Sequence, residues 1–319
     1  MILNKSIESL YTSMAYDDAF RTLETECDDI LVPYVNYVFN EHFDKSARIT
    51  RLRNEHFIKN ENQSSERRIT DSSFEIHQDN ITKKYHLECE SKPYDKSLLI
   101  RIFEYDAHIA LDAASYDTSS IRVIFPNTGL LLLRGSDKAP DSAQIIIEVP
   151  KDTLSYEVPI IKISDFSIDT IFEKSLFLLI PFYIFNYEND LKTINADKSR
   201  IESLKKLYTD IINKLDEYQK NGILSSQTCR VIIRLTHSVL FKITMKHKVV
   251  QQEVGDIMGG KVIEFPEITA YHDGVTEGKI EAILNSIKGI MSNLGKTAEE
   301  AMDILNVPKE DYPKYKSML

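Results

Sequence analysis

The residues with the clearest potential for chemistry lie in YHLECESK, the eight residues from Tyr85 to Lys92. The surrounding pattern predicts a β-strand here. Side chains in a strand alternate between its two faces, so Glu88, Glu90 and Lys92 are expected to point to one side. Two carboxylates and an ammonium in one row on a core strand are costly to bury unless something compensates their charge. A divalent cation, Mg²⁺ or alternatively Mn²⁺, is the natural compensator because both ions take carboxylate oxygens as ligands.

A further carboxylate comes from Asp71, on the preceding strand of the same predicted hairpin. An aspartate followed on the next strand by Glu-x-Glu or Glu-x-Lys is the arrangement that metal-assisted phosphodiester hydrolysis needs. The metal polarises the phosphate and acidifies a water molecule, which a neighbouring lysine or glutamate positions or deprotonates. The spacing by itself also fits an exposed edge strand with a solvated charged face, and it leaves both interpretations open.

Similarity to a known family covers most of the chain. The block SERRITDSSFEI at 65–76, followed by YHLECESKPYDKSLLIRIFEYDAHIAL at 85–111, resembles the Rpn family of recombination-promoting nucleases, or PD-(D/E)XK nuclease family transposases. The opening helical segment, FPNTGLLLLRG at 125–135 and the helical end of the chain extend the resemblance. It implies a restriction-endonuclease-like α/β core and a Mg²⁺-dependent DNA endonuclease with little sequence preference, acting in DNA recombination or transposition.

The resemblance also assigns roles to individual residues. The family's strand acid aligns with Asp71 and its Glu-x-Gln pair with Glu88 and Glu90, so these three are the implied metal ligands. Together with Lys92 they are the candidate catalytic residues. Family members commonly carry Gln where this chain has Glu90, and the wider superfamily carries Lys there. Lys92 as a substitute for that lysine is inferred from the strand row and not from the family.

Candidate substrate-binding residues flank this set. Arg101 and Tyr105 match the RxxxY segment of the family and, being four residues apart, share one face of a predicted helix. Arg101 could pair with a phosphate or with a site carboxylate, and Tyr105 could hydrogen-bond a water on the metal. A helix-surface ion pair and a half-buried aromatic are the alternative interpretations. Arg67 and Arg68 close a stretch, 45–68, with seven basic and three acidic side chains, and we assign both to DNA contact.

The elements that must position these residues fall into a mixed first half and a helical second half. The hairpin carrying the acidic residues is followed by a predicted helix over 96–115 and by further strand patterns up to residue 163. An opening helix over 17–41 is expected to break near Pro33. We therefore predict an α/β fold with a PD-(D/E)XK nuclease-like core at 1–165, a helical region at 166–265 and a helical tail at 266–319.

The composition of the chain restricts which binding partners and which cellular compartment are expected. The 319 residues carry a net charge of −10, which disfavours tight, purely electrostatic binding to nucleic acid but leaves room for a nuclease with a locally basic surface. Three widely spaced cysteines form neither a disulfide framework nor a zinc site, and they favour a reducing cytoplasm. The most apolar run, 175–185, is interrupted by Pro181 and falls short of the roughly 20 residues of a bilayer span, so we expect no membrane crossing.

Two further expectations concern assembly and an alternative function. Leu284, Ile287, Met291 and Leu294 form a coiled-coil-type seam, whose cover is expected to be the helical half of the chain or a second subunit. A nuclease that cuts both strands of a duplex gains from two sites related by a two-fold axis, which favours a homodimer.

The alternative to the enzyme is a catalytically weak or inactive relative acting as a DNA-binding or interaction protein, motivated by Glu90 and by the acidic net charge.

Overall fold

The computed structural model describes residues 16–52, 55–59, 65–69, 72–135, 138–263, 284, 286–288, 290–291, 295–305 and 312–316. At 55–59, 65–69, 259–263, 304 and 313–314 it describes the backbone alone. The chain divides into two compact units, Met1–Gly260 and Lys261–Leu319.

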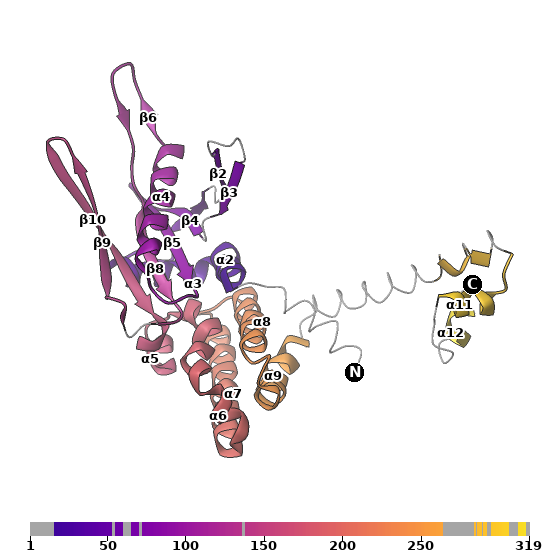
Figure 1. Ribbon diagram of the computed structural model, residues 1–319. Helices are drawn as coiled ribbons and strands as arrows, with labels where there is room; N and C mark the ends of the chain where they lie inside the picture. The colour runs from indigo at the N-terminus through magenta and orange to yellow at the C-terminus, as the bar shows by residue number, and fades with distance from the viewer. Residues whose placement is uncertain are drawn as a thin grey trace. The chain divides into compact units, whose positions relative to one another are not determined.

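The first unit is built on a six-stranded mixed sheet with the strand order β1-β4-β5-β8-β10-β9 (Figure 1). Its strands are β1 (Arg48–Arg51), β4 (Ser72–Gln78), β5 (Ile81–Glu90), β8 (Asn127–Leu132), β9 (Ser142–Val149) and β10 (Asp152–Lys162). β4 and β5 are antiparallel across a tight turn at Asp79, which adopts a φ of 54° that aspartate tolerates. β5 and β8 are parallel, so they need a crossover, and helix α4 (Lys96–Asp112) supplies it. The expected mixed α/β fold is confirmed.

Helices cover both faces of this sheet. On one face, Leu98 and Ile102 of α4 pack with Leu130 of β8 in an apolar cluster. On the other lie α2 (Tyr16–Glu26) and α3 (Asp28–Phe39), so closely that a Cβ at Gly129 would stand 3.0 Å from Val38 Cγ1. The side chains of β5 alternate between these two helical layers. Glu88 stands beside Leu130 of β8, which packs against α4, so Glu88 and Glu90 lie on the face of β5 that is turned toward α4.

The opening helix breaks at a different place from the predicted one. α2 and α3 meet at Cys27, whose backbone is not helical, and Pro33 lies inside α3. A proline within a helix removes one backbone hydrogen bond, and the buried side chains of Ile30, Leu31 and Tyr34 hold α3 together around it. The predicted break near Pro33 is therefore wrong.

The helical half packs around the most apolar segment of the chain. Residues 177–185 are all buried within a long 3₁₀ helix, η3 (Phe177–Asp190), and α8 (Ser226–Ile243) lies against it. The other helices of this half are α5 (Ile168–Glu173), α6 (Leu191–Ala196), α7 (Lys198–Lys220) and α9 (Lys248–Ile263), with a 3₁₀ turn η2 (Ile163–Asp165) before them. Within the described residues, no helix combines the length and the apolar character that crossing a membrane requires.

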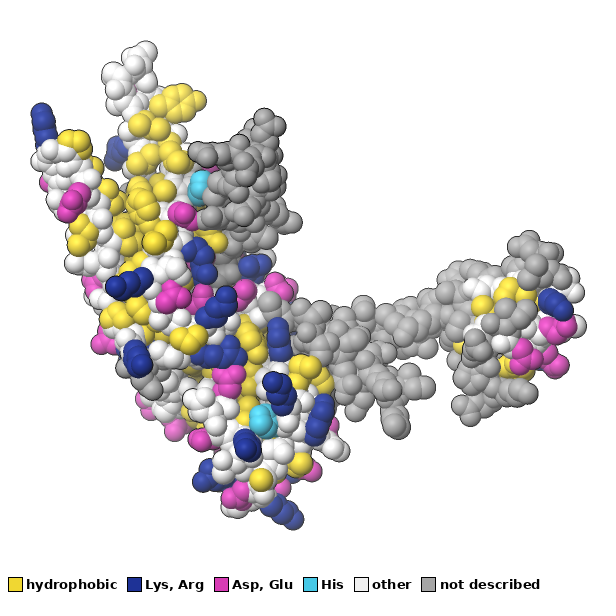
Figure 2. All heavy atoms as spheres, in the orientation of Figure 1, with side chains coloured by type: hydrophobic (Ala, Val, Ile, Leu, Met, Phe, Trp, Pro, Cys, Tyr) yellow, Lys and Arg dark blue, Asp and Glu magenta, His cyan; other side chains and the backbone are white. Residues whose placement is uncertain are grey.

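Two hairpins extend from the core and carry exposed apolar side chains. One joins β9 and β10, with Ile146 and Leu154 exposed, and the other joins β6 (Ser115–Tyr116) and β7 (Ile121–Arg122). Tyr116 and Ile121 in the second hairpin are also exposed. Figure 2 shows apolar side chains on the surface over these hairpins. They belong to the edges of the fold and not to its core.

The second unit buries part of the apolar seam within itself. Ile287 is fully buried in a cluster with Ala301 and Met302 of α11 (Ala298–Ile304) and with Tyr315 of α12 (Tyr312–Lys316). A capping box of Thr297 and Glu300 begins α11. The described part of the seam is thus covered by the last helices of the same tail, a possibility outside the two that the sequence led us to expect. Leu294 lies outside the described residues.

Candidate functional site

The candidate site lies where β5 faces α4. The side chains of Glu88 and Glu90 project from this face of β5, and Arg101 projects toward them from the first half of α4. Arg101 Nη2 lies 2.8 Å from Glu90 Oε2 and 3.6 Å from Glu88 Oε2. The side chains of the two glutamates are 3% and 12% exposed, whereas that of Arg101 is 37% exposed. Arg101 was expected to pair either with a phosphate or with a site carboxylate. In the structure it pairs with the carboxylates of Glu88 and Glu90.

Lys92 does not join this row. β5 ends at Glu90, and Lys92 lies in the following loop, exposed, with its backbone N–H donating to Glu90 Oε1 at 2.8 Å. Alternation of side chains holds only while the chain stays in a strand, and the proline at position 93 cannot extend the ladder. The expectation that Lys92 shares the row of Glu88 and Glu90 is therefore wrong, and the acidic row has two members.

Three other predicted site residues, Asp71, Arg67 and Arg68, have side chains outside the described part of the chain. Asp71 is outside the described residues, and Ser72, where β4 begins, stands opposite Leu87. Arg67 and Arg68 belong to β3 (Ser65–Ile69), which pairs with β2 (Glu55–Lys59) in a two-stranded sheet separate from the six-stranded one. Only their backbone is described, so DNA contact by these arginines stays a prediction.

The structure adds a histidine that the sequence analysis did not single out. His86 is fully buried between two carboxylates, with Nδ1 2.7 Å from Asp106 Oδ1 and Nε2 3.0 Å from Glu88 Oε1. The protonated ring has an N–H donor on each nitrogen, so it fits a position between two carboxylate oxygens. Burial alone would lower the pKa of His86, but its hydrogen bonds to Asp106 and Glu88 outweigh burial and raise that pKa to about 9. Tyr105 packs edge-on against the same ring, at a centroid distance of 6.0 Å.

Asp106, on the other side of the His86 ring from Glu88, accepts three hydrogen bonds. Its Oδ1 accepts from Thr128 Oγ1 of β8 and its Oδ2 from Tyr156 OH of β10, both at 2.6 Å, in addition to the bond from His86. These bonds replace the water that a buried carboxylate would otherwise need. Two signals in the sequence could have identified His86 and Asp106. His86 lies two residues before Glu88 and so on the same face of the strand, and Asp106 interrupts the apolar stripe of α4.

Asp17 lies at the margin of this cluster. Burial raises the pKa of its carboxyl, Arg21 lowers it, and the charge of Glu90 raises it, which places Asp17 within electrostatic range of the acidic row. Among the described residues, however, no three histidine, cysteine, aspartate or glutamate side chains are grouped so that they could hold a metal ion.

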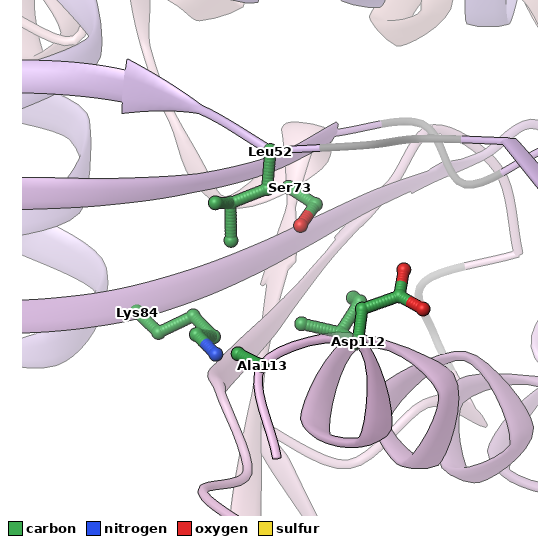
Figure 3. Close-up of a pocket in the computed structure, with 6 residues that line it drawn as sticks. Leu52, Ser73, Lys84, Asp112 and Ala113 are labelled. Atoms are coloured by element: carbon green, nitrogen blue, oxygen red, sulfur yellow. The ribbon is translucent and has the colours of Figure 1, made fainter. Parts of the chain in front are cut away.

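A cavity of about 350 Å³ lies on the same face of β5, on the side of His86 away from Glu88 (Figure 3). Ser73, Lys84 and Asp112 contribute polar groups to its lining, and Leu52, Ile109 and Ala113 contribute apolar ones. Lys84 is 8% exposed, and no hydrogen bond or ion pair joins its ammonium to another described residue. Ser73 stands directly opposite His86 in the sheet, so the cavity adjoins the buried network.

Protonation of His86 makes the stability of the fold dependent on pH. The pKa of about 9 in the folded chain exceeds the ordinary value of 6.5, so the stabilisation is complete below about pH 6.5 and is lost as the pH rises through 9. We expect the free energy of unfolding, measured with urea, to fall between these pH values. The His86→Gln variant should lack this decrease, and an equal slope in both proteins would assign it to other groups.

Two charged groups thus share the face between β5 and α4: an inner one of Asp106, His86 and Glu88, and an outer one of Glu88, Glu90 and Arg101. Glu88 belongs to both. Compared with protein-family models, with curated proteins and with solved structures, the chain gives no match.

Proposed function

We propose that this chain is a Mg²⁺-dependent DNA endonuclease of the Rpn type, with Mn²⁺ as an alternative ion, which hydrolyses phosphodiester bonds with little sequence preference. The observation that carries the proposal is the pair Glu88 and Glu90, two carboxylates on one face of a central strand with Arg101 set against both. The mixed sheet is compatible with a restriction-endonuclease-like core. A role in DNA recombination or transposition is part of the proposal and rests on the resemblance.

The donor set suits a hard divalent cation. Glu88 and Glu90 offer carboxylate oxygens, the ligands that Mg²⁺ and Mn²⁺ prefer, and Asp71 is the third proposed ligand. A bound cation would neutralise charge on the phosphodiester and make a water molecule more acidic. In the metal-free chain Arg101 pairs with both glutamates, so a bound cation would compete with the guanidinium for their oxygens.

The residues around the carboxylates would bind and orient the substrate. The Arg101 side chain is partly exposed and on a flexible stem, so it can move from Glu90 to a phosphate oxygen, which a guanidinium binds well. Tyr105 is buried against His86 and is better placed to support the site than to contact DNA. His86 and Lys84 on this face are buried, whereas Arg101 is partly exposed, so Arg101 is the better described candidate for phosphate contact.

Arg101→Gln should separate metal binding from substrate binding. We expect plasmid cutting to fall about a hundredfold, as when one donor to a transition-state anion is removed, while Mn²⁺ affinity measured by calorimetry is unchanged or higher. The affinity should not fall because glutamine no longer competes for Glu88 and Glu90. Arg122→Gln, in the β6–β7 hairpin, is the control and should cut normally. Wild-type cutting by Arg101→Gln would remove the arginine from the proposed mechanism.

A plasmid nicking assay with and without Mg²⁺ tests the proposed function directly. The wild-type chain should nick DNA only when the ion is present, and Asp71→Ala should abolish the reaction. A parallel assay with single-stranded RNA distinguishes a deoxyribonuclease from a ribonuclease. Absence of nicking at millimolar Mg²⁺ and Mn²⁺, with the chain folded, would contradict the proposal.

A specific observation also favours the alternative, a catalytically weak or inactive relative that binds DNA or another protein. Arg101 already compensates Glu88 and Glu90 within the chain, so the carboxylates have a partner without any ion. Calorimetric titration with Mn²⁺ separates the two functions. Binding that disappears in Glu88→Ala favours the enzyme, and no binding at millimolar metal favours the inactive relative.

A homodimer is the remaining proposal about assembly. The apolar seam of the tail supports a dimer less, because Ile287 is buried within the tail itself, and the proposal rests on the advantage of two sites for cutting both strands of a duplex. Light scattering of the full chain at tens of micromolar tests it, since a monomer at that concentration contradicts the dimer.

A further inference from the structure

Buried polar contacts join Glu88 to the core of the fold. Thr128 and Tyr156 donate to the two oxygens of Asp106, and the ring of His86 lies between Asp106, 2.7 Å from Nδ1, and Glu88, 3.0 Å from Nε2. The groups come from β8, β10, α4 and β5, so four elements of the core meet in one chain of bonds. It ends at Oε1 of Glu88, the carboxylate that also belongs to the outer site.

The two oxygens of Glu88 have different surroundings. Oε1 lies 3.0 Å from His86 Nε2 in the fully buried part of the site, whereas Oε2 faces the partly exposed guanidinium of Arg101 at 3.6 Å. A glutamate side chain has several rotatable bonds, and a hydrogen bond to one oxygen removes most of that freedom. The bond from His86 therefore determines which oxygen of Glu88 is presented to the outer site.

We propose that His86 and Asp106 are positioning residues, which hold the Glu88 carboxylate with Oε1 turned into the core and Oε2 turned toward Arg101 and a bound cation. The inference rests on the proposed metal-dependent function. Carboxylates that bind metals are commonly held by hydrogen bonds from a second layer of residues, and loss of such a partner costs about 10- to 100-fold in metal affinity or activity. Neither residue touches the substrate or the cation in this proposal.

Nuclear magnetic resonance of the metal-free chain, labelled with ¹⁵N at histidine, tests the hydrogen bonds without any catalytic readout. His86 should show two ring N–H signals protected from solvent exchange, because both nitrogens are bonded and the ring is buried. Glu88→Gln should shift the Nε2–H signal and Asp106→Asn the Nδ1–H signal. Absence of a protected Nε2–H signal in the wild-type chain would overturn the proposal.

Calorimetry with Mn²⁺ alone tests the positioning role. We expect His86→Gln to bind Mn²⁺ about 10- to 100-fold more weakly, and to cut DNA with a lower kcat but an unchanged KM, because its contacts with DNA are intact. Lys84→Gln is the matched control: Lys84 is a buried residue of β5 two positions from His86, with no bond to the network, and its substitution should change the affinity less than twofold.

The outcomes separate this inference from the proposed function. If the folded wild-type chain binds no Mn²⁺, the proposed function fails and the positioning role fails with it. If the wild type binds and His86→Gln binds equally well with the same kcat, only the positioning role fails. Should His86→Gln not fold, as judged by circular dichroism, Asp106→Asn, which keeps the size of the side chain, takes its place with the same expected losses.

Discussion

Glu88→Gln is expected to reduce Mg²⁺-dependent plasmid cutting about a thousandfold. Under the proposed function, Glu88 is the carboxylate shared by the inner and outer groups, so its loss removes a metal ligand and the end point of the His86 bond together. A loss of about 4 kcal/mol of transition-state stabilisation corresponds to this factor in rate. The measurement is kcat/KM on supercoiled plasmid, at an enzyme concentration high enough to detect the residual activity.

Glu90→Gln is the control for this result and should behave in the opposite way. It installs the residue that the resembled family commonly has, and it frees Arg101 from its 2.8 Å contact, so cutting should be retained or increased. Both variants remove one negative charge from the same strand face, so a general charge effect would change both equally. If Glu90→Gln abolishes cutting while Glu88→Gln leaves it intact, the assignment of the strand is wrong by two residues.

Asp106→Ala is expected to lower the free energy of unfolding by about 3 to 5 kcal/mol, the range found when one partner of a buried ion pair is removed. The alanine would leave a buried imidazolium with one carboxylate instead of two, and it would leave the Thr128 and Tyr156 hydroxyls without their acceptor. Urea unfolding followed by circular dichroism near pH 7 measures the change. This prediction concerns the fold alone and holds whether or not the chain is a nuclease.

Asp169→Ala provides the matched control for stability. Asp169 also forms a short ion pair, at 2.6 Å with Lys214, but both side chains are exposed, and such pairs are worth about 1 kcal/mol or less. A large loss in Asp106→Ala with a small loss in Asp169→Ala assigns the effect to burial. Equal losses would mean that Asp106 contributes no more than a surface charge, contrary to its three hydrogen bonds.

Much of the local structure follows from the sequence by itself. The alternation in YHLECE is enough to place Glu88 and Glu90 on one face of a strand, and apolar periodicity is enough to place Arg101 on the helix that follows. Both patterns repeat within a few residues, so they report local geometry without knowledge of the fold. The capping box at Thr297 is predictable for the same reason.

Only the tertiary structure decided which groups meet. His86 contacts Asp106, 20 residues away, and Asp106 contacts Tyr156, 50 residues away, because the crossover through α4 and the order of β5, β8 and β10 bring these elements to one face. No periodicity within a single element encodes such a meeting. The end of β5 at Glu90, which takes Lys92 out of the row, likewise depends on where the sheet stops pairing.

The sequence by itself therefore determined the elements and the face that carries the acidic pair, whereas the fold determined its electrostatic partners. Charges buried in a core are stable only beside groups that compensate them, and those groups come from whichever elements the topology places there. The contact of Arg101 with Glu90 was therefore one of two partners expected from the sequence, the other being a phosphate. The contact of His86 with Glu88 was not expected, because it depends on how the sheet packs against α4.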